Sequence, residues 1–205
     1  MRNEIKYILN KFEAQFFLKK INAKPSFPPR YIYSLYYDTK SLKNFTDSEE
    51  GTVPRSKWRV RNYSNSFNDK KNVNDIFCNN LIIEKKETFE KYRTKKRIFL
   101  KNIFLDKASS LIKIISKKDL NPNVYVTYHR NYYTLDNNIR ITVDTNIKFF
   151  QLRSNILVNE RKSKDIIIEE KKPIYSEDNT VFNLIGDKHS RNSKYCEALK
   201  TVFNI

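Results

Sequence analysis

The chain has 205 residues, and its 40 Lys and Arg against 23 Asp and Glu give a formal net charge of +17. Such a field attracts anions at neutral pH. Only two glycines occur, Gly51 and Gly186, which excludes a Walker-type P-loop and a GxGxxG loop. Phosphates would therefore have to be held by side chains.

The cysteines and histidines argue against a disulfide scaffold and against a zinc site. Cys78 and Cys196 are isolated and form no CxxC pair, which favours a reduced protein with inert thiols, and His129 and His189 are the only histidines. No stretch has the apolar length of a signal peptide or of a membrane span. We expect a soluble, cytoplasmic protein with a single domain over residues 1–205.

The first part of the chain predicts strands separated by one helix and a connection. Strands are expected over residues 2–9, 31–38 and 57–63. Between the first two, a helix places Phe12, Phe16, Phe17 and Ile21 on one buried face and ends at Lys24-Pro25. The connection over 39–55 starts as a helix, and the polar run 64–80 is expected to be a long, mobile loop between antiparallel strands.

The rest of the chain predicts further strands, a helix over 106–120 and a helix over 193–203. These strands are expected over residues 82–86, 91–100, 124–133, 139–149 and 166–172. About eight antiparallel strands with one apolar and one charged face can close on themselves. The predicted fold class is mainly β (α+β), a closed antiparallel tunnel barrel with the charged face inside and helices packed outside.

Basic residues recur at every second position within these strands. Because alternate residues of a strand lie on one face, Lys57, Arg59 and Arg61 share a face. Similar patterns with carboxylates mixed in occur over 82–86, 95–99, 126–130, 140–144 and 167–171. A solvated sheet surface is one interpretation. Cations on one concave face would repel, however, unless acids or a polyanion held them, which indicates a phosphate-rich ligand.

Short motifs follow one another in the order seen in a known family and span most of the chain. They are Arg2-x-Glu4-x-Lys6-Tyr7, Ser34-Leu35-Tyr36-Tyr37-Asp38-Thr39, Lys57-Trp58-Arg59-Val60-Arg61-x-Tyr63, Ile83-Glu84-Lys85-Lys86, Lys95-Lys96-Arg97, Tyr128-x-Arg130, Arg140-Ile141-Thr142-Val143-Asp144, Glu169-x-Lys171 and Ser193-Lys194-Tyr195. The chain thus resembles the VTC domain, the polyphosphate polymerase domain of the vacuolar transporter chaperone complex, within the CYTH-like superfamily of triphosphate tunnel metalloenzymes. The resemblance implies inward Lys and Arg that grip a triphosphate or polyphosphate, and carboxylates that hold Mn²⁺ or Mg²⁺.

The resemblance also implies roles for individual residues. Phosphate binding falls to Lys6, Arg59, Arg61, Lys86, Lys95, Arg97, Arg130, Arg140, Lys171, Arg191 and Lys194. The candidate catalytic residues among them are Lys6, Arg59, Arg61, Arg130 and Lys194. Glu169 matches the principal metal ligand; Glu4 and Glu84 are further candidates that could instead neutralise neighbouring cations. Arg2 stands where the superfamily has the first acid of ExExK, which counts against a two-metal phosphatase.

Several other residues have a structural interpretation. Asp144 shares a face with Arg140 and is expected to be an internal salt-bridge partner rather than a metal ligand. The tyrosine pairs on strands are expected to pack in the core, with base stacking as the alternative; they are Tyr36, Tyr37, Tyr132 and Tyr133. Lys85, Lys96 and Lys172 fall on the opposite strand faces.

Three functions remain open at this stage. The first is a metal-dependent polyphosphate polymerase that transfers the γ-phosphate of ATP to a growing chain. The second is a metal-dependent inorganic or nucleoside triphosphatase, and the third is a non-catalytic polyphosphate or nucleic-acid binder. The expected partners are ATP or another triphosphate and polyphosphate. No nucleic acid is expected, because no RRM or KH signature occurs, and a membrane partner protein stays possible.

Overall fold

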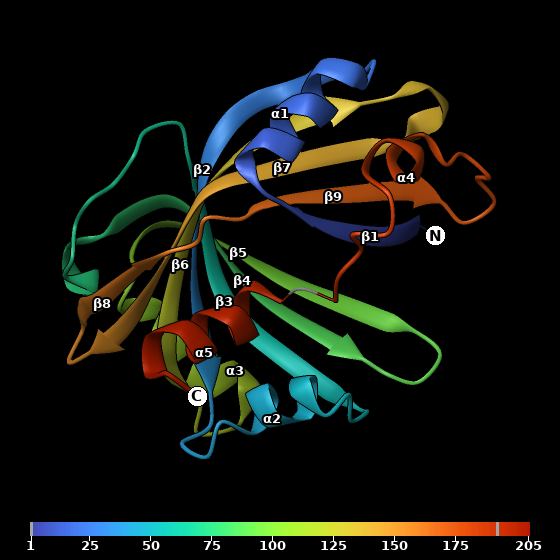
Figure 1. The fold of residues 1–205 in the computed structure, drawn as a ribbon. Coiled ribbons are helices and arrows are strands. Elements are labelled where there is room, and N and C mark those ends of the chain that lie inside the picture. Colours follow the sequence, from blue (N-terminus) through green and yellow to red (C-terminus); the bar gives the residue numbers. More distant parts are fainter. Residues whose placement is uncertain (1, 192) are drawn as a thin grey trace. The chain divides into compact units, whose positions relative to one another are not determined.

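The computed structural model describes residues 2–191 and 193–205 (Figure 1). The strands are β1 (Arg2–Leu9), β2 (Lys24–Asp38), β3 (Arg55–Ser64), β4 (Phe77–Thr88), β5 (Arg93–Phe104), β6 (Asn121–Thr134), β7 (Arg140–Arg153), β8 (Ile156–Lys162) and β9 (Ile166–Pro173). The helices are α1 (Lys11–Lys20), α2 (Lys43–Glu49), α3 (Lys107–Ser116), α4 (Thr180–Ile185) and α5 (Lys194–Phe203), with short 3₁₀ turns η1 (Val73–Asp75) and η2 (Asp136–Asn138).

The strands join in the hydrogen-bonded order β1-β9-β7-β6-β2-β3-β4-β5, and β8 pairs with β7. The predicted class, mainly antiparallel β with helices outside, is confirmed. Within the described residues the hydrogen-bonded path has two ends, β1 and β5, so the ladder itself is open rather than continuous around a barrel. The chain has one strand more than expected, because β8 was not predicted.

Contacts divide the chain into two compact units. The first unit comprises Met1–Tyr31, Tyr128–Ile147 and Lys162–Asn192. The second unit comprises Ile32–Thr127, Lys148–Arg161 and Ser193–Ile205. Strands β2, β6 and β7 each contribute one part to each unit.

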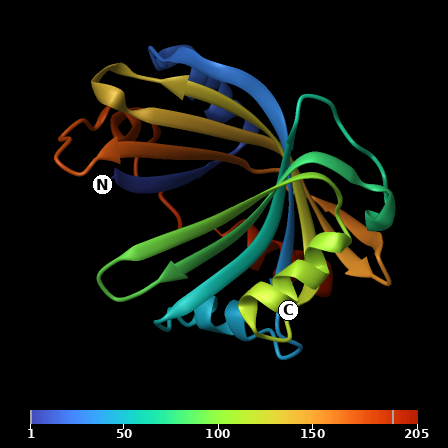
Figure 2. The ribbon, with the colours of Figure 1, turned by 180° about the vertical axis from the view of Figure 1, so that it is seen from behind.

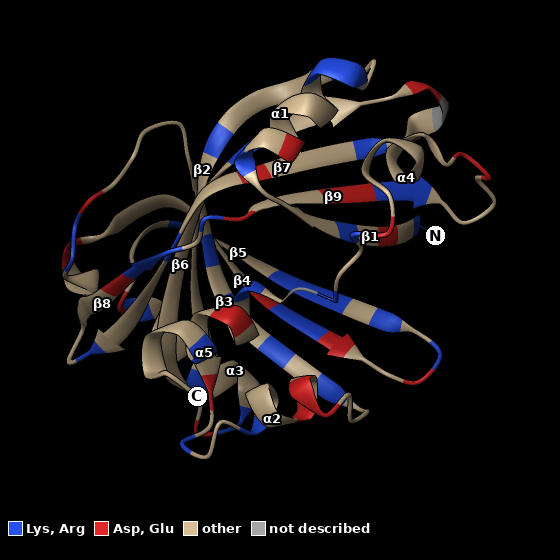
Figure 3. Cartoon of the chain, in the orientation of Figure 1, with Lys and Arg blue, Asp and Glu red and all other residues tan. Residues whose placement is uncertain are grey.

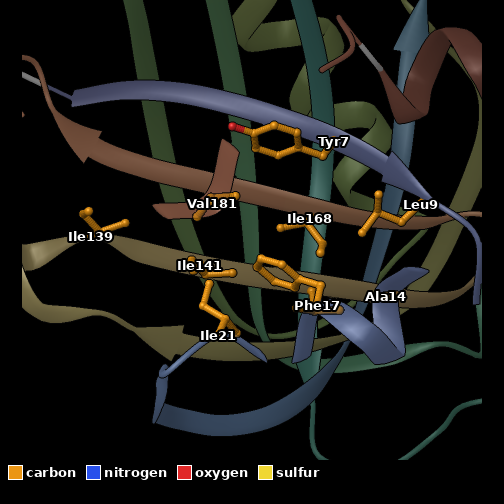
Figure 4. Packing of buried hydrophobic residues seen from close by; sticks show 10 residues of the cluster. Tyr7, Leu9, Ala14, Phe17, Ile21, Ile139, Ile141, Ile168 and Val181 are labelled. Carbon is orange, nitrogen blue, oxygen red and sulfur yellow. The ribbon is translucent and has the colours of Figure 1, made fainter. Parts of the chain in front are cut away.

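In the first unit, β1 pairs antiparallel with β9, and β9 with β7. Their apolar face packs against α1 and α4 through a cluster of buried side chains, shown in Figure 4. The cluster consists of Tyr7, Leu9, Ala14, Phe17, Ile21, Ile139, Ile141, Val143, Ile168 and Val181. Because side chains alternate along a strand, this packing directs Glu4 and Lys6 of β1 and Glu169 and Lys171 of β9 to the other face.

Helix α1 buries a different face from the one predicted. Ala14, Phe17 and Ile21 are buried, whereas Phe12 and Phe16 are 82% and 54% exposed. The prediction that Phe12 and Phe16 belong to the core face is therefore wrong. At about 100° per residue, positions 14, 17 and 21 form one stripe and positions 12 and 16 lie on the opposite side. The helix begins with a capping box, in which Asn10 and Glu13 exchange side-chain and backbone hydrogen bonds.

In the second unit, β3, β4 and β5 form an antiparallel meander. Helix α3 follows β5 and packs against it, as the view from behind shows (Figure 2), and α2 packs against β3 and α5. The Asp38 carboxylate at the end of β2 accepts hydrogen bonds from the backbone N–H groups of Asn44 and Phe45 in α2. It also accepts the Tyr195 hydroxyl of α5. One buried acid thus ties β2 to both helices.

The β3–β4 connection is anchored rather than free. The Asn68 N–H donates to the Tyr33 hydroxyl at 2.7 Å. The Leu157 N–H donates to the Lys71 carbonyl at 2.7 Å, and the Val73 N–H donates to the Asn155 carbonyl at 2.9 Å. The prediction of a long polar loop between antiparallel strands is confirmed, although β4 begins at Phe77 and the loop is shorter than the predicted 64–80. The mobility expected of the loop stays a prediction. The partners that hold it lie in β2 and in the unpredicted β7–β8 hairpin.

Candidate functional site

Cations from three neighbouring strands gather on one face of the second unit. The strand register places Lys57, Lys86 and Lys95 in one row across β3, β4 and β5, and Arg59, Glu84 and Arg97 in the next. Figure 3 shows these strands crossed by blue bands. The intervening residues Trp58, Val60 and Ile83 are buried on the other face. The alternation in the sequence therefore separated the apolar from the charged strand positions correctly here.

Glu84 lies at the centre of this arrangement and is 2% exposed. Its Oε2 accepts the Arg59 Nε at 2.6 Å, and its Oε1 accepts the Lys95 Nζ at 2.6 Å and the Arg97 Nε at 3.2 Å. The Arg61 Nη1 lies 3.9 Å from Oε2. We call these five residues the Glu84 cluster. Burial alone would raise the pKa of Glu84, but the charges of Arg59, Arg61 and Lys95 hold it well below its usual value.

Hydroxyl groups of β2 hold the two arginines that β3 contributes to the Glu84 cluster. The Arg59 Nη1 donates to the Tyr36 hydroxyl at 3.2 Å, and the Tyr36 ring stacks on Tyr195 at 5.2 Å. Although burial opposes the shift, the charges of Arg59 and Arg61 lower the pKa of Tyr36 to about 8. Lys194 contributes to the same shift, so its charge lies near this phenol. The Arg61 Nε donates to Ser34 Oγ at 3.1 Å.

The beginning of α5 meets the lysine row through Lys57. The Lys57 Nζ donates to Ser193 Oγ at 2.8 Å and lies 3.7 Å from Cys196 Sγ. Ser193 is the N-cap of α5 and accepts the Cys196 N–H. Lys57 was not among the residues assigned to the site. Its shared face with Arg59 and Arg61 was the available signal, and the family motif covered it without giving it a role.

A second charged group lies on the first unit. The register across β1, β9 and β7 places Glu4, Lys171 and Arg140 in one row and Lys6, Glu169 and Thr142 in the next. The Lys171 Nζ lies 2.5 Å from Glu169 Oε1 and 3.6 Å from Glu4 Oε2. The Lys6 Nζ lies 3.7 Å from Glu4 Oε1. We call Glu4, Lys6, Glu169 and Lys171 the Glu169 cluster.

Nearby cations keep the buried Glu169 carboxylate ionised. Burial would raise the pKa of Glu169, but the charges of Arg130, Lys171 and Lys6 hold it well below the usual range. Arg130 itself makes a two-pronged contact with Asp144, with Nε–Oδ1 at 2.5 Å and Nη2–Oδ2 at 2.7 Å. Asp144 is thus a salt-bridge partner as predicted, although the contact found is with Arg130 of β6 rather than with Arg140.

The oxygen atoms of the two clusters differ in how free they are to coordinate a metal ion. Both oxygens of Glu84 already accept from cationic nitrogens. Near Glu169 the donors are hard oxygens, namely the carboxylates of Glu4 and Glu169 and the buried Thr142 Oγ1, for which the described residues supply no hydrogen-bond partner. Mg²⁺ and Mn²⁺ prefer such oxygens and often take only one or two carboxylates beside phosphates. In residues 2–191 and 193–205, no three His, Cys, Asp or Glu side chains converge as a ready-made metal site.

The predicted residues therefore divide between the units. The second unit brings together Arg59, Arg61, Lys86, Lys95, Arg97 and Lys194. The first unit brings together Glu4, Lys6, Arg130, Arg140, Glu169 and Lys171. Arg191 is exposed in the segment before α5. Of the lysines assigned to the opposite faces, Lys85 pairs with Glu87 at 2.6 Å, and Lys172 donates to the Asp178 carbonyl at 2.6 Å.

Comparison with known proteins identifies both a family and a fold. The VTC domain model matches residues 1–203. The PH1819 protein of Pyrococcus horikoshii OT3 has a TM-score of 0.58 at 15% identity, with 98% of this chain and 99% of that chain covered. The PH1012 protein of the same organism also scores 0.58 at 15% identity, with 97% and 99% covered. A predicted adenylate cyclase from Vibrio parahaemolyticus scores 0.54 at 15% identity, with 97% of each chain covered. We found no match among curated proteins.

Among the described residues, no helix is both long and apolar enough to cross a membrane.

Proposed function

The chain belongs to the VTC domain family and has the fold of the CYTH-like triphosphate tunnel proteins, and on this premise we propose that it is a metal-dependent phosphotransferase. Its proposed reaction moves the γ-phosphate of ATP onto a growing polyphosphate chain. One observation carries the proposal: four cations of β3 and β5 surround the single buried carboxylate of Glu84 on β4, the strand between them. A fixed excess of positive charge is what a row of phosphates requires for binding.

The residues of the Glu84 cluster and the lysines beside it have different roles in this proposal. Arg59 and Arg61 present planar guanidinium groups, which match the oxygens of a phosphate with two donors each. Lys57, Lys86 and Lys95 extend the positive surface by one row. Glu84 holds the cations in place and offsets part of their repulsion, because its oxygens are already occupied by nitrogen donors. Lys194 is proposed to contact the nucleotide or the end of the chain.

The Glu169 cluster is the proposed metal-binding part. Glu169 and Glu4, with the Thr142 hydroxyl, would hold Mn²⁺ or Mg²⁺, and phosphate oxygens would complete the ligand shell. A bound divalent ion supplies neutralisation of the charge on the transferring phosphoryl group. Lys6, Lys171 and Arg130 keep Glu169 ionised near neutral pH. Arg140 adds a further cation to the same strand face.

The proposed chemistry needs no protein nucleophile. A terminal oxygen of polyphosphate attacks the γ-phosphorus of ATP, the bond from that phosphorus to the β–γ bridging oxygen breaks, and ADP leaves. The attacking oxygen is already ionised near neutral pH, so no strong general base is required. If water attacked in place of polyphosphate, the protein would be a triphosphatase. The cytoplasm, which we expect as the location, supplies ATP and divalent ions.

Incubation of the purified protein with ATP and Mn²⁺ or Mg²⁺ tests the proposal directly. The products are separated into long polyphosphate, by gel electrophoresis, and orthophosphate, by colorimetric assay. Accumulation of long polyphosphate supports the polymerase, whereas release of orthophosphate alone supports the triphosphatase. Neither product, together with RNA binding as tight as tripolyphosphate binding, would favour the non-catalytic nucleic-acid binder.

A further inference from the structure

Two phenylalanines project from α1 on the side of the helix that faces away from the core. Phe12 is 82% and Phe16 54% exposed, while Ala14 and Phe17 of the same helix are buried. At about 100° per residue, Phe12, Phe16 and Lys19 lie within about 60° of one another. Single exposed apolar residues are ordinary, but here two neighbouring Phe residues on the outermost stripe of a helix are each more than half exposed.

The charges beside these rings are positive. Lys11, Lys19 and Lys20 are exposed at the two ends of α1, which carry blue bands in Figure 3, and Lys24 follows at the start of β2. The Lys20 Nζ lies 5.9 Å from the centre of the Phe16 ring. The acid of this helix, Glu13, is held by the Asn10 N–H and by Lys188. We call Lys11, Phe12, Phe16, Lys19 and Lys20 the Phe12 face.

We propose that the Phe12 face docks this protein onto the surface of an anionic lipid bilayer, with α1 lying in the plane of the interface. A helix that combines Phe with Lys binds such a surface by inserting its apolar side chains and by attracting lipid phosphates and carboxylates. Projecting rings on a convex helix suit a fluid interface, which needs no matching pocket, better than they suit a rigid protein partner. The lysines match the negative charge of the lipid headgroups.

This inference is independent of catalysis, because none of its residues belongs to the Glu84 or Glu169 cluster. It concerns the location of the protein at a membrane surface rather than what it turns over. The net charge of +17 would by itself draw the protein weakly to any anionic surface. The experiment must therefore separate insertion of Phe12 and Phe16 from general attraction.

The test is flotation of the full chain with vesicles of phosphatidylcholine, with and without phosphatidylserine, in the presence of saturating tripolyphosphate to occupy the basic clusters. We expect binding to the vesicles that contain phosphatidylserine. Phe12→Ser/Phe16→Ser, which leaves the net charge unchanged, should weaken this binding at least about tenfold. Thermal melting checks that the variant folds, which the exposure of both rings favours.

A matched control comes from the same unit. Tyr175 and Phe182 are 88% and 48% exposed, so Tyr175→Ser/Phe182→Ser removes a similar exposed aromatic area elsewhere. This variant should bind within about twofold of the unmodified chain, since the altered residues lie outside the docking face. Equal loss of binding in both double variants, or no loss in either, would overturn the proposal.

A second readout reports insertion directly. Phe12→Trp places an indole at the proposed contact, whereas Trp58, the one natural tryptophan, is buried. On binding, its emission should shift to shorter wavelength and be quenched by lipids brominated on the acyl chain. Unquenched emission in bound protein would mean that attraction is electrostatic only. Concentration-dependent self-association that disappears in Phe12→Ser/Phe16→Ser, without vesicle binding, would assign the face to a second copy of the chain instead.

Discussion

At the scale of single residues, Arg59 uses its guanidinium group in two directions. Its Nε and Nη2 both lie 2.6 Å from Glu84 Oε2, and its Nη1 reaches the Tyr36 hydroxyl at 3.2 Å. Lysine carries the same charge but cannot reproduce this planar set of donors. The position thus requires geometry as well as charge, which makes a charge-conserving substitution informative.

Arg59→Lys should lower kcat/KM for the triphosphate about 10–100-fold, because directed charge-assisted hydrogen bonds are lost while the net charge stays the same. Steady-state kinetics measures the effect. Arg161→Lys on β8, which is exposed, is the control and should leave the kinetics unchanged. Unchanged kinetics in Arg59→Lys and in Arg59→Ala would show that this strand face does not contact the substrate.

Glu169→Gln should remove most metal-dependent turnover and leave tripolyphosphate binding largely intact. The substitution deletes a metal-binding carboxylate without adding negative charge, and it frees Lys171 from its 2.5 Å contact. Turnover and isothermal titration with tripolyphosphate separate the two effects. Glu160→Gln is the matched control. Glu160 also forms salt bridges with two lysines, Lys71 and Lys148, but it lies outside the Glu169 cluster. Unmodified rates in Glu169→Gln would remove this residue from the metal site.

Tyr36 makes a pH dependence testable, because its pKa is lowered to about 8 in the folded protein. An acid with a lowered folded pKa stabilises the fold fully above its unfolded pKa of about 10, and this contribution is lost as the pH falls through about 8. The unfolding free energy of the unmodified protein relative to Tyr36→Phe should therefore rise by about 2–3 kcal/mol between these values. Urea titrations at both ends of that window measure the difference.

The same ionisation predicts a change in affinity. Above pH 8 a phenolate beside Arg59 and Arg61 competes with phosphate for their charge, so tripolyphosphate binding should weaken more in the unmodified protein than in Tyr36→Phe. Parallel pH profiles of the two proteins, or a phenol that does not titrate below pH 10 in ultraviolet difference spectra, would contradict the assignment.

At the scale of elements, strand parity could be predicted from the sequence and the partners across strands could not. Alternation alone placed Lys57, Arg59 and Arg61 on one face, because the side-chain period of a strand is two. Which acid each cation meets depends on register between strands. For that reason the Arg130–Asp144 contact, fixed by β6 and β7, was attributed to the face of Arg140.

Helix α1 also shows that the sequence pattern does not reveal which residues a side chain will contact. Phe12, Phe16 and Phe17 looked alike in the sequence, and only the packing partner decided that Phe17 enters the core with Ala14. Strand β8 was not predicted, and its pairing with β7 follows a turn at Ser154 and Asn155, where φ is 48° and 65°. Two positive φ values favour such a hairpin turn, but serine there gave no strong signal.

The anchor of α2 and α5 yields a prediction at this scale. Asp38 accepts the N–H groups of Asn44 and Phe45 and the hydroxyl of Tyr195, although Tyr195 lies 157 residues away in the chain. Asp38→Ala should destabilise the protein by about 2–4 kcal/mol and Tyr195→Phe by about 1–2 kcal/mol. Because both changes remove one shared bond, the double variant should cost less than their sum. Strict additivity in urea unfolding would mean that the bond contributes nothing.

At the scale of the whole molecule, the excess of 40 basic over 23 acidic residues is not spread at random over the strands. In each unit, strand pairing gathers several Lys and Arg side chains around one buried carboxylate, Glu84 or Glu169. These cations repel one another when no further anion is bound. Bound polyanion should therefore stabilise the fold more than its contacts alone suggest, since it also relieves that repulsion.

Tripolyphosphate at about a hundredfold excess over its Kd should raise the unfolding free energy by about 2.7 kcal/mol through mass action. The gain should shrink as salt is added, because exposed charges are screened over about 10 Å at 0.1 M ionic strength. Calorimetric melting across a salt series measures both effects, with short RNA of matched charge as the comparison. If binding depends on compact phosphate rows across β3, β4 and β5, RNA should stabilise the protein much less than tripolyphosphate. Equal stabilisation by RNA at every salt concentration would mean that the basic face recognises charge without regard to its spacing.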